Sequence, residues 1–137
     1  MQVYKTKANR LQGTDFHEVR KKAFGIYTTI KKKSKRSPYV RSAYFNKEKI
    51  FLAIFWQHLW SKEKWQDRMR RLKYYAAAIE LIQNSKFDPK SKDNPNKPGE
   101  ILHRFTGITN DHYLFHVQIK IDKQSGRKDF ISVFPDK

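Results

Sequence analysis

Hydrophobic residues in the first third of the chain recur at steps of three and four, which is the spacing of an amphipathic helix. Asp15 precedes these residues and Glu18 follows it by three, which is the spacing of a capping box at a helix N-terminus. Lysines gather at the other end of the pattern, where the helix dipole favours cations. We predict a helix that begins at Asp15 and stops at Ser37-Pro38, because the residue before a proline avoids helical backbone.

The middle of the chain predicts a short strand followed by more helix. Residues 39–45 are aromatic and β-branched, as in an edge strand. Asn46 is a suitable N-cap for a helix over the apolar stretch that follows, up to Trp60. From Trp65 to about Asn84, apolar residues again recur at steps of three and four. Ser61 either caps this second helix or marks a bend in one long helix.

The last third of the chain alternates apolar and polar residues, as half-buried strands do. Strands are predicted at 101–108, 113–121 and 128–134, with turns at Asn110-Asp111 and Ser125-Gly126. This order predicts an α+β fold, with N-terminal helices packed on a small C-terminal antiparallel β-sheet, a meander. We expect a single domain over residues 1–137, with a helical part at about 14–84, a proline-rich loop at 85–100 and a β-meander at 101–135.

The polar side of the last predicted hairpin carries imidazole, amide, ammonium and hydroxyl groups, from His116, Gln118, Lys120 and Ser132. The strand register decides which residues share this side, since a slip of one residue exchanges the two faces. A left-handed Gly126 in a three-residue loop sets core residues opposite core residues. The resulting pairs are Val117 with Val133, Gln118 with Ser132, His116 with Phe134, and Ile119 with Ile131.

The first hairpin has two possible registers. A two-residue turn at Asn110-Asp111 sets His103 opposite Gln118, so that His103 joins the polar face. A slip of one residue sets Arg104 opposite Gln118 and Thr106 opposite His116. Both registers place a polar group beside His116, and the sequence alone does not choose between them.

The net charge of the chain indicates the class of partner that it binds. The 137 residues carry a formal charge of +17, with a sequence pI near 10.1, which predicts attraction to polyanions. Residues 1–70 hold 18 basic and 5 acidic residues, and residues 20–41 hold nine basic residues and no acidic one. We expect RNA as the partner, with backbone phosphates bound by residues of the first helix and its end. These residues are Lys31, Lys32, Lys33, Lys35 and Arg36.

Several classes of chemistry are absent from the sequence. There is no cysteine, so disulfides and thiolate chemistry are excluded. No P-loop, dinucleotide fingerprint, nucleophile elbow or zinc motif occurs, and we expect no cofactor and no metal. The N-terminus lacks the apolar core of a signal peptide, and no apolar run is long enough to span a bilayer, so we expect a cytoplasmic protein without a membrane partner. His17 and His58 are assigned to helix packing or the surface.

Three segments of the C-terminal half resemble the barnase, EndoU, colicin and RelE-like ribonuclease superfamily, in the form borne by phages and mobile elements. They are His103–Gly107, Phe115–Lys120 and Gly126–Pro135. The resemblance implies a metal-independent ribonuclease of toxin type, held in check by an acidic antitoxin or immunity protein. We expect no Glu on the proposed face, which favours a histidine scheme of the EndoU kind over a carboxylate base.

The mixed face supports RNA cleavage by attack of the ribose 2′-OH on the adjacent phosphorus, a reaction that needs a base, an acid and cations. His116 is the first choice as base or acid, with His103 as its counterpart. Lys120, Arg127 and Lys128 are candidates to stabilise the phosphate, and Arg104 stands beside them in one register. Ser132, Thr106 and Gln118 are candidates to orient phosphate or ribose. The alternative is a basic module that binds RNA or DNA without cleaving it.

Overall fold

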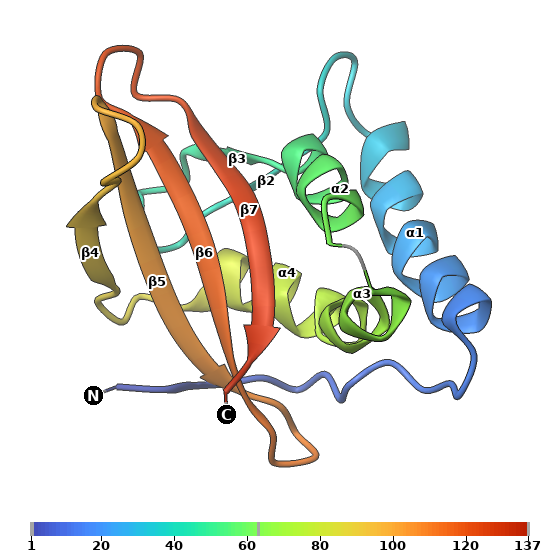
Figure 1. Ribbon diagram of the computed structural model, residues 1–137. Coiled ribbons are helices and arrows are strands. Elements are labelled where there is room, and N and C mark those ends of the chain that lie inside the picture. Colours follow the sequence, from blue (N-terminus) through green and yellow to red (C-terminus); the bar gives the residue numbers. More distant parts are fainter. Residues whose placement is uncertain (1, 63, 137) are drawn as a thin grey trace.

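The computed structural model describes residues 2–62 and 64–136, and it packs a group of helices against a mixed, curled sheet that forms half of a barrel (Figure 1). The helices are α1 (Phe16–Lys32), α2 (Ala53–Trp60), α3 (Trp65–Leu72) and α4 (Tyr75–Asn84). The strands are β1 (Tyr4–Lys5), β2 (Tyr39–Arg41), β3 (Lys49–Phe51), β4 (Lys90–Asp93), β5 (Glu100–Ile108), β6 (Leu114–Asp122) and β7 (Lys128–Pro135).

The sheet has the order β1-β5-β6-β7-β3-β2, and β4 pairs with β5 on the same side as β1. Strands β1 and β3 run parallel to β5 and β7, while the other pairs are antiparallel. The α+β class is therefore right, but helices packed on a small antiparallel meander are wrong. The meander β5-β6-β7 exists, and four short strands extend it: β1, β2, β3 and β4.

The wrong prediction at residues 46–52 has a local cause. Asn46 and Lys47 both adopt positive φ angles, of 55° and 65°, and so form a turn instead of opening a helix. Asn tolerates this left-handed backbone better than most residues. The turn sends Ile50 into β3, where it is fully buried and lies opposite Lys128 of β7. The helix starts only at Ala53.

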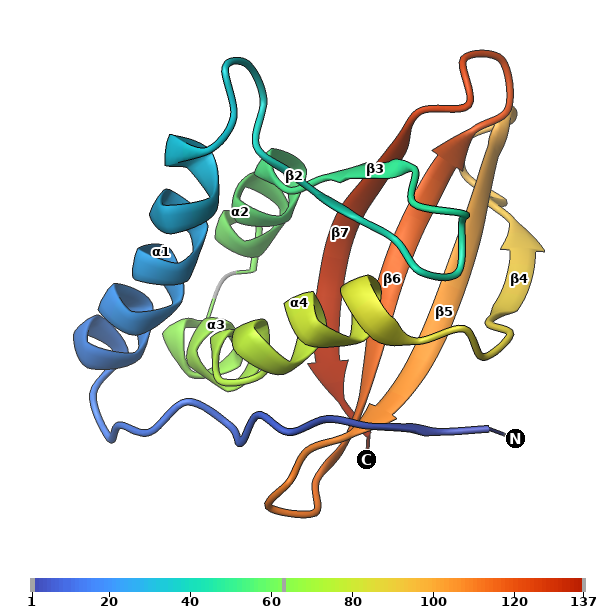
Figure 2. The same ribbon diagram turned by 180° about the vertical axis from the view of Figure 1, so that it is seen from behind.

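The helix predicted from Trp65 to Asn84 is split in two. In a continuous helix, the carbonyl of Lys73 would accept a hydrogen bond from the backbone N–H four residues later. Here it accepts one from the N–H of Leu11, at 2.8 Å, in the extended segment that precedes α1. The N-terminal segment thus crosses the junction of α3 and α4, as Figure 2 shows from behind.

Other predictions are confirmed. Asp15 caps α1 by accepting a hydrogen bond from the backbone N–H of His17, at 3.3 Å. The helix ends after Lys32, ahead of Ser37-Pro38. In the hairpins, Thr106 lies opposite His116, which is the second of the two registers considered. Gly126 has a φ of +76°, as the turn required.

The β6–β7 register is confirmed up to a bulge. Gln118 lies opposite Ser132 and Val117 opposite Val133, as expected. Ile119, however, lies opposite Phe130 instead of Ile131, because the ladder shifts by one residue between Gln118 and Ile119. An extra residue of this kind bends a strand and increases its twist. The bulge contributes to the curl of the sheet, and it turns Phe130 toward the helices.

Aromatic rings fix the helices to the inner face of the sheet. Phe55 of α2 stacks on Phe130 of β7, with ring centroids 4.8 Å apart and an angle of 6° between the rings. Tyr74 stacks on Phe115 of β6 at 5.5 Å. Leu81 of α4 lies where Gly107 of β5 leaves room for it. These contacts place α2, α3 and α4 against β5, β6 and β7.

Two glycines test this packing in opposite directions. A Cβ atom at Gly107 would lie 2.7 Å from both Leu81 Cδ1 and Phe115 Cζ, so Gly107→Ala should cost about 1–3 kcal/mol of stability through overpacking. A Cβ atom at Gly25 in α1 meets nothing within 4 Å, so Gly25→Ala should add about 1 kcal/mol through helix propensity. Urea unfolding of both variants measures the two changes, and an unchanged midpoint for Gly107→Ala would contradict the tight contact.

Candidate functional site at the edge of strand β7

The polar face predicted from the sequence is the face of the sheet that points away from the helices. Phe115, Val117 and Ile119 of β6 are buried against the helices, so the alternate residues His116, Gln118 and Lys120 face outward. Residues directly opposite them in the ladder share that face. These are Leu102, Arg104 and Thr106 of β5 and Asp129, Ser132 and Phe134 of β7.

His103 does not belong to this face. It lies opposite Ile119 and therefore on the side of the helices. Its ring packs against that of Phe45 at 5.4 Å, and its Nδ1 lies 2.6 Å from the hydroxyl of Ser91. The register that sets His103 on the same face as His116 is wrong, so the two histidines do not form the expected acid–base pair.

His116 is held on two sides. Its Nε2 lies 2.7 Å from a carboxylate oxygen of Asp136, and its Nδ1 lies 3.0 Å from the hydroxyl of Thr106. A carboxylate only accepts hydrogen bonds, so Nε2 carries a proton. The residue is 8% exposed, and its ring also packs against Phe134 at 5.4 Å. Both ring nitrogens are engaged, so this arrangement leaves none for a substrate.

The edge of β7 carries a second polar group that spans helix and sheet. Strand β3 pairs only with the first two residues of β7, and in the described chain no other strand continues along that edge. Arg71 of α3 covers it. Its Nη1 donates to Ser132 Oγ at 2.7 Å and to the carbonyl of Val133 at 3.5 Å, while its Nε donates to Asp67 at 3.3 Å. Arg71 is therefore fixed from both sides.

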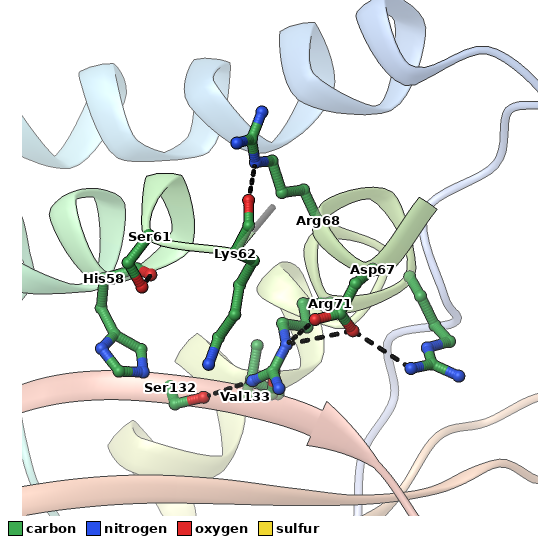
Figure 3. Close-up of polar contacts among 9 residues, drawn as sticks. His58, Ser61, Lys62, Asp67, Arg68, Arg71, Ser132 and Val133 are labelled. Carbon is green, nitrogen blue, oxygen red and sulfur yellow. Dashed lines mark hydrogen bonds and ion pairs between the residues drawn. The ribbon is translucent and has the colours of Figure 1, made fainter. Parts of the chain in front are cut away.

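Two more side chains extend toward the same part of β7. His58, in the last turn of α2, and Lys62, just after that helix, point toward Ser132 and Arg71 (Figure 3). Partial burial, followed by the positive charges of Lys62 and Arg71, lowers the pKa of His58 below its usual value. Among the described residues, the His58 ring makes no hydrogen bond. We call His58, Lys62, Arg71 and Ser132 the edge cluster.

The edge cluster combines groups that can bind an anionic substrate and remove a proton from it. At neutral pH its histidine is an uncharged base, because the lowered pKa disfavours protonation. Its lysine and arginine supply positive charge, and Arg71 presents a planar donor group suited to phosphate. Ser132 adds a hydroxyl. Asp67, the acidic residue that contacts the cluster within the described part of the chain, binds Arg71 from the side away from Ser132.

Sequence reasoning found Ser132 but missed the other members of this cluster. Arg71 and Ser132 are 61 positions apart, and no pattern along the chain links them. A weaker signal was available in the spacings of four between His58 and Lys62 and between Asp67 and Arg71. The second spacing puts Asp67 and Arg71 on one side of a helix, whereas Lys62 follows the end of α2, and neither spacing tells which surface the residues meet.

Other predicted site residues are occupied by structural contacts. Lys120 pairs with Glu100 at 3.3 Å on the outer face, so the expectation that no Glu lies there is wrong. Lys128 is 8% exposed and pairs with Glu48 at 3.0 Å. It is the ladder partner of Ile121, so it lies on the face of the sheet that packs against the helices. Neither lysine is a free cation for a phosphate.

Arg104 and Gln118 remain accessible on the outer face. With Leu102 they line a shallow groove of about 200 Å³, and Lys90, Ser91 and Lys92 of β4 form its other side. Arg104 is exposed and Gln118 is half-buried, and Gln118 lies directly opposite Ser132 in the ladder. The outer face thus runs from this groove toward the edge cluster.

A larger groove collects the basic residues predicted to bind nucleic acid. It measures about 580 Å³ and lies between the end of α1, strands β2 and β3, and the turn before β7. Five cations and no acidic residue line it. The lining consists of Lys33, Ser34, Lys35, Arg36, Ser37, Tyr39, Lys49, Phe51 and Arg127. We call it the basic groove.

Aromatic rings support two of these cations. The guanidinium of Arg127 lies over the ring of Phe51 at 4.1 Å, and the ammonium of Lys49 lies over Tyr39 at 4.7 Å. Lys31 and Lys32 sit on the last turn of α1, outside the groove lining. Lys33, Lys35 and Arg36 are brought together as the sequence suggested, Arg127 joins them instead of the polar face, and Lys128 does not line the groove.

Comparisons with known protein families, with curated proteins and with solved structures found no match for this chain. The resemblance to the ribonuclease superfamily therefore stays a prediction. Within residues 2–62 and 64–136, no group of three or more His, Asp or Glu side chains is placed to hold a metal ion. In the same part of the chain, no helix has the length and apolar character needed to cross a membrane.

The two hydrogen bonds of His116 predict a stability effect. His116→Ala removes both bonds and leaves the hydroxyl of Thr106 half-buried, so the protein should lose about 1–3 kcal/mol of unfolding free energy. The matched control is His17→Ala, an exposed residue on α1, which should change stability by less than about 0.5 kcal/mol. Chemical denaturation measures the unfolding free energy of both variants. Equal values would show that the two hydrogen bonds of His116 do not contribute to stability.

Proposed function

We propose that this protein is a metal-independent ribonuclease that cleaves RNA through attack of a ribose 2′-OH on the adjacent phosphorus. The observation that carries the proposal is the edge cluster, in which an imidazole with a lowered pKa lies beside two cations and a hydroxyl. Transphosphorylation needs a base near neutral pH and positive charge around the phosphorane. The basic groove supports a polyanionic substrate.

In this scheme His58 removes the proton from the 2′-OH, whose oxygen forms a bond to phosphorus. Arg71 and Lys62 stabilise the negative charge that develops on the non-bridging oxygens. The bond from phosphorus to the 5′-oxygen breaks, and that oxygen takes a proton from the ammonium of Lys62. The products are a 2′,3′-cyclic phosphate and a 5′-OH. DNA lacks the 2′-OH, so it is bound but not cleaved.

His116 has a positioning role in this scheme. Its ring packs against Phe134, and the guanidinium of Arg71 lies 5.7 Å from the centroid of the same Phe134 ring. Thr106 and Asp136 hold the His116 ring in place. The residue that the sequence ranked first thus supports the surface beneath Arg71. Gln118 lies opposite Ser132, and in this scheme it binds phosphate or ribose next to the cluster.

A specific observation favours a second candidate, a nucleic-acid-binding module without catalysis. The basic groove contains none of the four residues of the edge cluster, and it has the charge and stacked cations of a phosphate-binding surface on its own. Lys and Arg contacts to backbone phosphates need no catalytic group. A cleavage assay separates the two candidates.

The cleavage assay compares wild type with His58→Ala on a short single-stranded RNA, under single-turnover conditions and with excess chelator. We expect wild type to cleave in chelator and His58→Ala to lose about 10²- to 10⁴-fold in rate, the usual contribution of a general acid or base. His17→Ala, another exposed helical histidine, should cleave like wild type. Binding without cleavage by wild type favours the binding module, and cleavage abolished by chelator overturns the metal-independent scheme.

The pH profile of the same reaction reports on His58. A base must be neutral, so the rate should rise with pH through an inflection below about 6.5, since partial burial and the two nearby cations lower the His58 pKa. Arg71→Gln removes one of these cations and should move the inflection upward while it lowers the rate at every pH. An inflection that does not move in this variant would place the titrating group elsewhere.

The basic groove predicts a change in salt dependence. Replacing Lys35 and Arg36 by Gln should weaken RNA binding and lower the slope of log K against log salt by about 0.7 for each phosphate that these residues neutralise. The control replaces Lys5 and Lys7 of the N-terminal segment by Gln, which removes the same charge from exposed positions outside the groove. Equal changes in both double variants would mean that net charge, and not the groove, determines binding.

A further inference from the structure

A pocket of about 510 Å³ lies next to the edge cluster, where α3, the N-terminal segment and the β5–β6 turn meet. Its walls include Trp65 and Met69 of α3, Tyr113 of the turn, and the cations Arg10, Arg70 and Lys73. Its volume falls within the usual range for a small-molecule site. We call it the aromatic pocket.

The aromatic rings of this pocket are open to solvent. Trp65 is 50% exposed and Tyr113 is 45% exposed, although both present large apolar surfaces. Tyr74 beneath them is buried against Phe115 and belongs to the core. Trp and Tyr rings that stay exposed on the wall of a pocket are suited to stacking with a flat ligand.

The wall opposite Trp65 is held in place by charge. The guanidinium of Arg10 lies over the Tyr113 ring at 3.5 Å, and its Nε donates to Asp111 at 3.1 Å. The backbone N–H of Arg10 also donates to Asp111, at 3.2 Å. One face of Tyr113 is therefore covered by a fixed cation, while Trp65 has no cation over its ring among the described residues.

Two contacts join the aromatic pocket to the edge cluster and to His116, the positioning residue. Asp67 accepts hydrogen bonds from Arg70, which lines the pocket, at 3.1 Å and from Arg71 of the edge cluster at 3.3 Å. Asp136, which also lines the pocket, binds His116 at 2.7 Å. The aromatic pocket is therefore linked to the edge cluster through the carboxylate of Asp67.

We propose that the aromatic pocket receives one unpaired base of single-stranded RNA, stacked on Trp65, while the neighbouring phosphate lies at the edge cluster. This inference rests on the proposed function, because the base is placed beside the phosphate that reacts at the edge cluster. It specifies that the RNA substrate is single-stranded. The cations Arg10, Arg70 and Lys73 at the pocket complement the flanking phosphates. A base inside a duplex is stacked on both faces and cannot enter, so double-stranded RNA is excluded.

The test measures binding, by fluorescence anisotropy, to a short 2′-deoxy oligonucleotide and to the same backbone with abasic sites. Neither probe can react by 2′-OH attack, and both carry the same charge. Wild type should bind the probe with bases more tightly. Trp65→Ala should weaken binding of that probe by about 5- to 100-fold, which is the contribution of one stacked base, and leave the abasic probe unchanged.

Two further variants keep the test decisive. Trp60→Ala is the matched control, because Trp60 is 44% exposed but lies outside the pocket, between Arg20 and Arg68. It should keep the preference for bases. Trp65→Phe retains a ring and should retain most of the affinity, which separates a loss of stacking from a loss of folding.

Equal binding of the two probes by wild type, or an equal loss for both probes in Trp65→Ala, would overturn the inference. These outcomes do not depend on cleavage, because neither probe is cleaved. RNA cleavage without base-dependent binding would remove the pocket and leave the ribonuclease proposal standing. Base-dependent binding without RNA cleavage would do the reverse.

Discussion

The backbone hydrogen-bonding groups on both edges of strand β7 need partners, and the structure is organised around how those partners are supplied. One edge pairs with β6 along its length, but the other pairs with β3 for only two residues. Unpaired strand edges are costly when buried and prone to aggregation when exposed. Phe55 of α2 packs on Phe130, and Arg71 of α3 donates to Ser132 and to the Val133 carbonyl. The need to cover this edge thus brings Arg71, a cation of α3, to Ser132 and Val133 of β7.

The acidic residues are few, and several of the most buried are engaged by basic partners. Glu100 pairs with Lys120, Asp129 with Arg127, and Asp111 with Arg10. Such pairs hold turns and strand ends without forming an acidic surface. The remaining positive charge is therefore left to gather, as it does in the basic groove, where no acidic residue opposes it. A compact state with this charge repels itself, which an acidic or polyanionic partner would relieve.

The parts of the fold that were predicted correctly depend on local signals. Asp15 caps α1, and the alternation in β5, β6 and β7 fixes which residues face the helices. The parts that were missed depend on distant segments. The division between α3 and α4 depends on the hydrogen bond from the backbone N–H of Leu11 to the carbonyl of Lys73. Strand β3 forms because the tight turn before it lets Ile50 pair with β7. The candidate site divides in the same way, since Ser132 and Gln118 follow from register alone, while Arg71 reaches them from another element.

The parallel pairing of β3 with β7 and of β1 with β5 has a consequence for how the chain folds. Ile50 lies opposite Lys128, and Tyr4 lies opposite Gly107, so each pair joins residues far apart in sequence. Closing such loops costs entropy before any contact offsets it, which slows folding. The hairpins β5–β6 and β6–β7 are local and can form early. Strand β4 is also close in sequence to β5 and pairs with part of its outer edge, whereas the free edge of β7 stays open to wrong partners until β3 docks.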